Sequence, residues 1–90
     1  MPWYMVERHL AGFPPEQLPA AAAAAKRTAQ EISSERADIR YVRSTWVPDT
    51  ERCYCLFEAP TREAVAETQT RAGLPYEQIH EAAFLTADDV

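Results

Sequence analysis

The sequence IRYVRSTWVPDTERCYCLFEA, residues 39–59, contains two extended segments joined by a short connection. Both segments are rich in β-branched and aromatic residues, which favour strands, and the second segment alternates residue by residue. Between them lie Pro48 and Asp49, residue types that favour a tight turn. The stretch therefore predicts a β-hairpin, and the remaining elements can be placed around it.

The two cysteines of the chain, Cys53 and Cys55, lie in the second strand of this hairpin. Alternation places them on the same side as Phe57 and Ala59. Two cysteines separated by one residue diverge too little for an unstrained disulfide, and they lack the partner ligands of a zinc ribbon. Because free cysteine behaves as a small hydrophobe, we expect both thiols in the core.

Four further segments complete the pattern of elements. Residues 3–10 alternate as a first strand, and residues 16–35 have an apolar stripe at helical spacing. Pro19 lacks a backbone donor, so it must lie in the first helical turn or follow a short separate turn. Thr61 is expected to cap a second helix over Arg62 to Ala72, which Gly73 ends. Residues 78–85 then form the last strand.

The order strand, helix, strand, strand, helix, strand predicts an α+β, ferredoxin-like sandwich with two helices on one face of an antiparallel sheet. In this arrangement the first strand lies between the third and the fourth. A chain of 90 residues is expected to form a single domain over residues 1–90. Because so small a domain leaves much surface exposed relative to its core, it often recruits a partner surface.

The side of the sheet away from the helices, here called the open face, is expected to be too apolar for contact with water. Its expected apolar residues are Trp3, Met5, Tyr54, Leu56 and Ile79. An exposed patch of this kind is typical of an interaction surface, and the simplest partner is a second copy of the chain. The sequence therefore predicts a homodimer that packs sheet against sheet in an α/β-barrel-like assembly.

Three carboxylates, Glu7, Glu58 and Glu81, are expected on the open face, with His9 two residues after Glu7. Like charges repel there unless a cation neutralises them. An imidazole beside carboxylates suits a divalent metal such as nickel, copper or zinc. In the alternative, the carboxylates pair at the sheet rim with arginines: Arg8, Arg40, Arg43 or Arg52. His80 faces away from Glu81 and is expected at the surface or the core edge, without a ligand role.

Charge and composition argue against several functional classes. The net charge of −5 argues against nucleic acid, and no polybasic segment is present for an anionic membrane. The first residues lack the pattern of a signal peptide, and no apolar run is long enough to span a bilayer. With two cysteines and no export signal, we expect a cytoplasmic protein. No phosphate-binding loop and no Ser/His/Asp pattern is found.

Most of the chain resembles a small ferredoxin-like family of formerly unknown function that includes a nickel-binding protein. The resemblance runs through residues 1–10, 40–60 and 71–82, and its shared elements fall at residues 6–8, 55–59 and 71–75. It implies a homodimer of ferredoxin-like subunits with nickel ions bound at the dimer surface.

Together these observations predict a small cytoplasmic metal-binding protein that sequesters or delivers nickel or another divalent transition metal. The candidate ligands are His9, Glu7, Glu58 and Glu81. One alternative is a cofactor-free enzyme acting on a hydrophobic small molecule in a dimer pocket, with Glu7 or His9 as general base. In that enzyme, Tyr54 or Trp46 would shape the pocket. The other alternative is a non-catalytic structural dimer.

Overall fold

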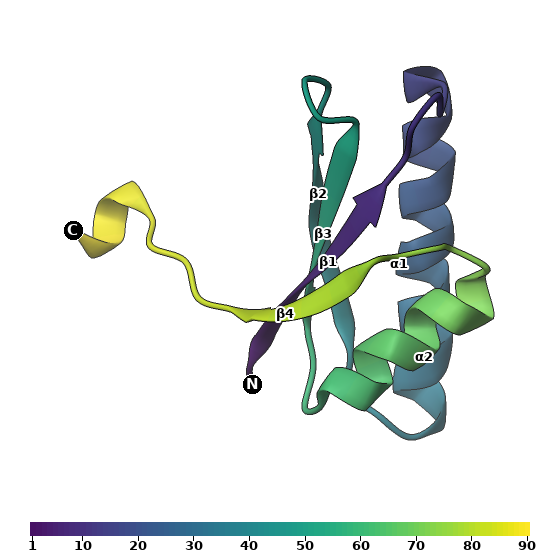
Figure 1. The fold of residues 1–90 in the computed structure, drawn as a ribbon. Coiled ribbons are helices and arrows are strands. Elements are labelled where there is room, and N and C mark those ends of the chain that lie inside the picture. Colours follow the sequence, from purple (N-terminus) through teal and green to yellow (C-terminus); the bar gives the residue numbers. More distant parts are fainter.

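The computed structural model describes residues 1–90 and has an α+β fold in which two helices cover one face of a four-stranded antiparallel sheet (Figure 1). In chain order, the elements are β1 (Trp3–His9), α1 (Leu18–Glu35), β2 (Arg40–Val47), β3 (Arg52–Glu58), α2 (Arg62–Ala72) and β4 (Gln78–Ala82). Two short 3-10 helices, η1 (Pro15–Gln17) and η2 (Ala87–Asp89), precede α1 and follow β4. The strands lie in the order β2-β3-β1-β4, so the first strand is between the third and the fourth.

The sequence signals for the two helices agree with the structure, although α1 begins two residues later than expected. Pro19 lies in the first turn of α1, and the short helix η1 comes directly before it. Thr61 caps α2, where its Oγ1 accepts a hydrogen bond from the backbone N–H of Ala64 at 3.2 Å. Gly73 follows α2 with a φ of 71°, a left-handed conformation that glycine adopts without strain. Both predicted helices are confirmed.

A β-bulge between Tyr41 and Arg43 decides which side chains of β2 face the helices. Strict alternation would put Arg43 on the same side as Tyr41. The extra residue shifts the pattern by one position. Ser44 and Trp46 therefore share the side of Tyr41 and lie opposite the two cysteines of β3.

The core lies between the sheet and the helix layer. Its largest fully buried side chains are Phe57, Ile32, Gln69, Val6, Val65 and Thr68. The ring of Tyr41 packs edge-on against Phe57, with 5.6 Å between the ring centroids. Cys53 and Cys55 are free and buried, each 4% exposed, as the alternation of β3 predicts. No helix is apolar over a length sufficient to cross a membrane.

The last strand is shorter than the sequence predicts. Ala82 pairs with Trp3, the first residue of β1, so the chain beyond Ala82 has no strand left to pair with. Phe84 instead packs edge-on against Trp3, with 4.9 Å between the ring centroids. From there the C-terminal segment leads away from the body on the side opposite the helices (Figure 1).

The register of β4 also differs from the sequence prediction. Tyr4 lies opposite Glu81, and Val6 lies opposite Ile79. Residues directly opposite each other share a face of the sheet. Because Tyr4 and Val6 belong to the buried core, the assignment of Ile79 and Glu81 to the open face is wrong. The residue between them, His80, is on the open face.

The open face is less exposed than expected. Leu56 is only 6% exposed, and Met5 is partly buried. The guanidinium of Arg40 lies 5.7 Å from the centroid of the Trp3 ring, a cation–π arrangement that covers part of this aromatic surface. The large hydrophobic residues that remain exposed are Met1, Tyr76, Phe84, Leu85 and Val90. Exposed apolar surface is thus concentrated near the chain ends.

Candidate functional site

A histidine and a glutamate meet on the open face. His80 Nε2 lies 2.8 Å from Glu7 Oε1. The other carboxylate oxygen, Oε2, is 3.6 Å from Nη1 of Arg52, which also pairs with Glu77. The side chains of Glu7 and His80 are 21% and 41% exposed, so solvent reaches both. An imidazole and a carboxylate are therefore held together by strands β1 and β4.

The four residues predicted as metal ligands are not brought together within one chain. His9 is exposed at the end of β1, on the same side of that strand as Glu7. Glu58 is opposite Trp3 at the other end of β1, about 20 Å from the end where His9 lies. Glu81 is on the helix side of the sheet. No group of three or more His, Cys, Asp or Glu side chains could hold a metal ion.

Arginines neutralise the carboxylates of the open face, as the alternative interpretation of the sequence expected. Nη2 and Nε of Arg40 donate hydrogen bonds to Glu58 Oε1 at 2.9 and 3.2 Å. Arg52 forms a longer ion pair with Glu7 and donates its hydrogen bond to Glu77. The contact between His80 and Glu7, by contrast, was not predicted from the sequence. The apolar character of Ile79 could have indicated it, because a core position for Ile79 puts His80 beside Glu7.

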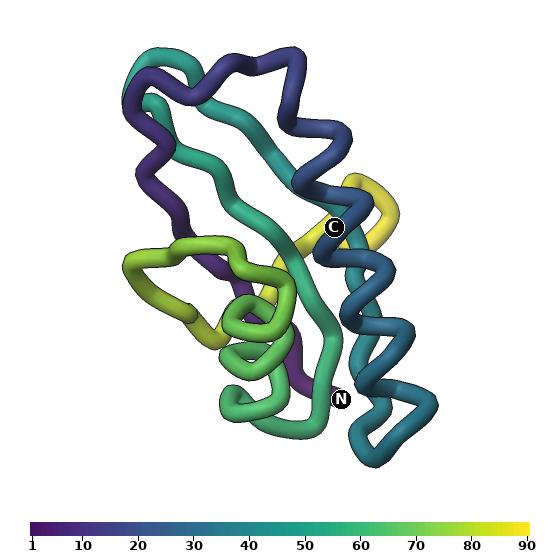
Figure 2. Tube along the Cα trace, turned by 90° about the vertical axis from the view of Figure 1, so that its right-hand side faces the viewer, coloured from purple at the N-terminus to yellow at the C-terminus, as the bar shows by residue number.

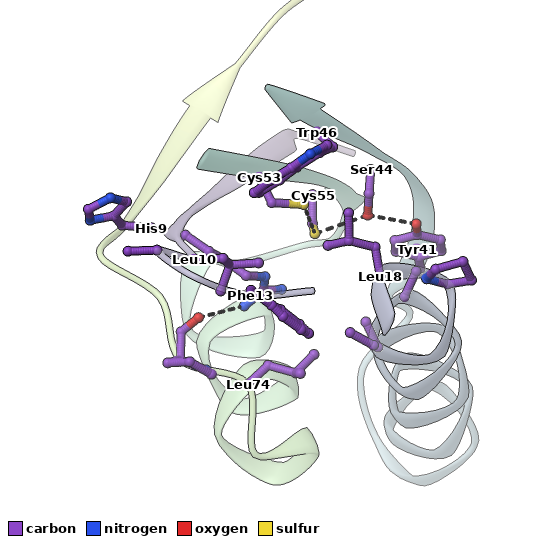
Figure 3. A pocket seen from close by; sticks show the side chains of 17 residues that line it. His9, Leu10, Phe13, Leu18, Tyr41, Ser44, Trp46, Cys53, Cys55 and Leu74 are labelled. Carbon is purple, nitrogen blue, oxygen red and sulfur yellow. Dashed lines mark hydrogen bonds between the residues drawn. The ribbon is translucent and has the colours of Figure 1, made fainter. Parts of the chain in front are cut away.

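A cavity of about 610 Å³ lies on the other side of the sheet, beside the start of α1 (Figure 3). Figure 2 looks onto the helix layer, where α2 lies beside the later turns of α1 and no helix lies beside its first turns. After Leu18 and Pro19 at its start, the α1 residues that face this space are small: Ala21, Ala22 and Ala25. Because alanine leaves unfilled the volume that a larger side chain would occupy, the alanine-rich start of α1 keeps the cavity open.

Hydroxyl and thiol groups form a chain along the sheet side of this cavity. The Tyr41 hydroxyl lies 2.8 Å from Ser44 Oγ, which lies 3.0 Å from Cys55 Sγ. The two sulfurs are 3.9 Å apart. The hydrogen bond with Cys53 lowers the pKa of the Cys55 thiol, and the charge of Arg8 and the Ser44 hydroxyl act in the same direction against burial. The same sulfur–sulfur contact, together with burial, raises the pKa of Cys53.

Arg8 carries a buried positive charge at the edge of the cavity. It is 4% exposed and forms no ion pair with a carboxylate. Its guanidinium donates to the backbone oxygen of Pro75 at 3.1 Å and to Gln69 Oε1 at 2.5 Å. Gln69 is itself fully buried and donates from Nε2 to the backbone oxygen of Val65 at 2.9 Å. The acceptors of Arg8 are thus neutral groups on α2 and on the loop that follows it.

The residues that the sequence suggests for an enzyme pocket are divided between the two faces of the sheet. Trp46 lines the cavity on the helix side, and His9, at the end of β1, lies at the cavity rim with its ring directed away from the interior (Figure 3). Glu7 and Tyr54 lie opposite each other on the open face. The catalytic base and the aromatic wall suggested by the sequence therefore do not share one pocket within the chain.

Comparison with known proteins places the chain in a family. Residues 4–82 match the family described as nickel responsive protein SCO4226-like. The chain belongs to the SCO4226-like family. The crystal structure of SCO4226 from Streptomyces coelicolor A3(2) is similar to this chain, with a TM-score of 0.77, 25% sequence identity, and coverage of 93% of this chain and 99% of that chain. No curated protein matches the sequence. The resemblance inferred from the sequence is confirmed, and the SCO4226-like family name connects the chain with a response to nickel.

Proposed function

We propose that the protein is a cytoplasmic homodimer that binds nickel or a related divalent transition metal for sequestration or delivery. The contact between Glu7 and His80 supports this most directly. Two donor atoms 2.8 Å apart are close to the spacing of neighbouring ligands on an ion with metal–ligand bonds of about 2.1 Å. Imidazole and carboxylate are donors that suit such ions, and membership of a nickel-responsive family favours nickel.

The second copy of the chain supplies the rest of the coordination. One chain offers only two adjacent donors at this place, whereas a two-fold axis through the open face doubles them. His9 and Glu58, on the same face, are further candidate donors. In this proposal each subunit is ferredoxin-like, and the two sheets form a barrel-like dimer. The exposed Phe84 and Leu85 of the C-terminal segment, 41% and 77% exposed, offer apolar surface for the contact.

Thermal unfolding of untagged protein with and without nickel tests the proposal. A metal that binds only the folded state stabilises it by about 2.7 kcal/mol when free metal is 100 times its dissociation constant. We expect His80→Ala and Glu7→Gln to remove most of this stabilisation. It should also fade below about pH 6, because histidine must be neutral to bind metal.

His9→Ala is the variant that separates the two ligand sets, since His9 is exposed on the same face but is not in contact with Glu7 within one chain. If His9→Ala removes the nickel effect and His80→Ala does not, the ligand set predicted from the sequence is favoured over the observed contact. If the untagged wild-type protein gives no calorimetric response to nickel, cobalt, copper or zinc at about pH 7.5, metal binding is ruled out and the structural dimer is favoured.

A further inference from the structure

The cavity has a charge pattern that the chain as a whole does not have. The protein has 14 Asp and Glu residues and only 9 Lys and Arg. None of the 17 residues that line the cavity is acidic, and Arg8 is the one Lys or Arg among them. The inside of this acidic protein therefore contains a pocket whose fixed charge is positive.

No carboxylate of the chain pairs with Arg8. Charged groups as deeply buried as Arg8 are normally paired, because an uncompensated charge in a weakly polar environment is costly. Its two neutral acceptors, the Pro75 carbonyl and the Gln69 amide, fix the guanidinium in place without cancelling its charge. A planar guanidinium held in this way is suited to a carboxylate, which it can bind through two parallel hydrogen bonds.

The remaining walls are suited to an apolar molecule. Phe13, Leu18 and Trp46 lie around the space, and the alanines of α1 form one side of it (Figure 3). Its volume of about 610 Å³ is within the range typical of small-molecule sites, about 300–1,000 Å³. Mostly apolar walls with a few well-placed polar groups are also typical of such sites.

We propose that this cavity binds a small apolar carboxylic acid. Its carboxylate pairs with Arg8, and its hydrocarbon or aromatic body lies against the first turns of α1. The site is separate from the metal site proposed above, because Arg8 and Glu7 are neighbours on β1 and point to opposite faces of the sheet.

One group within the chain competes with this ligand. Cys55 lies near Arg8, and as a thiolate it would supply the missing negative charge. A neutral molecule of the same shape would then bind as well as the acid, since Arg8 would gain nothing from a second anion. Comparing an acid with its alcohol therefore distinguishes the two arrangements in the wild-type protein.

The probes are naphthoate and naphthylmethanol, which share an aromatic body and differ in the charge of one group. Binding is measured by calorimetry to the wild type and to the variants Ala22→Leu, Ala23→Leu and Arg8→Met. Ala22 lines the cavity, while Ala23, the next residue on the same helix, is exposed and serves as the matched control.

We expect naphthoate to bind the wild type at least about tenfold more tightly than naphthylmethanol, as a charge-assisted pair requires. Ala22→Leu should weaken both probes about tenfold or more, and Ala23→Leu should weaken neither. Arg8→Met should reduce naphthoate affinity to that of the alcohol and leave the alcohol unchanged.

Equal affinities of the two probes for the wild type would overturn the pairing with Arg8. Undiminished binding to Ala22→Leu would overturn the location, because the probes would then bind outside the cavity. Absence of binding at millimolar naphthoate would overturn both the pairing with Arg8 and the location in the cavity. If Arg8→Met does not fold, the wild-type comparison and the two alanine variants still decide the question.

Discussion

Filling the cavity should make the protein more stable. Ala22→Leu adds three carbon atoms on the side of α1 that faces the empty space. Complete burial of three such groups stabilises by about 2.4 kcal/mol at ~0.8 kcal/mol each. Ala22 is itself only partly buried, so about half of this value, ~1.2 kcal/mol, is expected. For a domain of this size that gain corresponds to a rise of roughly 5–10 °C in the melting temperature.

Equilibrium unfolding in urea, followed by circular dichroism, measures the change, with Ala23→Leu as the control for helix propensity. The control should differ from the wild type by no more than about 0.5 kcal/mol, because its new side chain stays in solvent. A loss of stability of about 1–3 kcal/mol in Ala22→Leu would show an overpacked core and refute the existence of usable space. Increased stability combined with loss of naphthoate binding would be the expected compromise between stability and function.

Two further predictions concern the thiols and the second helix. Because contact with Cys53 lowers the pKa of Cys55, iodoacetamide should modify one thiol per chain with a half-maximal rate below the ordinary thiol value of about pH 8.5, as shown by mass spectrometry over a pH series. A midpoint at or above that value would contradict the assignment. Thr61→Ala should cost about 1 kcal/mol in urea unfolding through loss of the N-cap, and an unchanged midpoint would show that the hydrogen bond to Ala64 contributes nothing.

The helices and the hairpin could be predicted because their signals are local. Pro19 and Thr61 mark the starts of the two helices, and Gly73 marks the end of the second. Alternation in β3 placed both thiols in the core without any knowledge of its partner strands. Such signals depend on a few neighbouring residues, and one sequence is sufficient to interpret them.

The side-chain directions of β4 could not be predicted in the same way. The strand has five residues, and its sequence Gln-Ile-His-Glu-Ala has an apolar residue in either phase. A change of one position moves every side chain to the other face. Only the pairing with β1 shows that His80 shares a face with Glu7 while Glu81 does not. The expected open-face set therefore contained Glu81, which is on the helix side, and lacked His80.

The cavity depends on three features that are far apart in the sequence. The helix α2 does not extend beside the first turns of α1. The alanines leave the space between α1 and the sheet unfilled. The bulge in β2 turns Ser44 and Trp46 towards this space. The sequence showed the alanines as an apolar stripe, but helical periodicity does not indicate how far away the opposite wall is. The charge of Arg8 favours pairing with surface carboxylates, although its alternation with Glu7 places it on the buried side.

The alternation of β1 also explains how one acidic chain can present two opposite local charges. A net charge of −5 favours cations as ligands, and this inference applies to the open face, where Glu7 meets His80. One residue later the strand directs Arg8 into a cavity whose walls have no acidic residue. Solvent and salt screen the surface carboxylates from a ligand inside the protein far more than they screen a buried arginine in direct contact with it. The sign of the local charge at each face therefore follows from the residues that line it, and the net charge of the chain does not determine it.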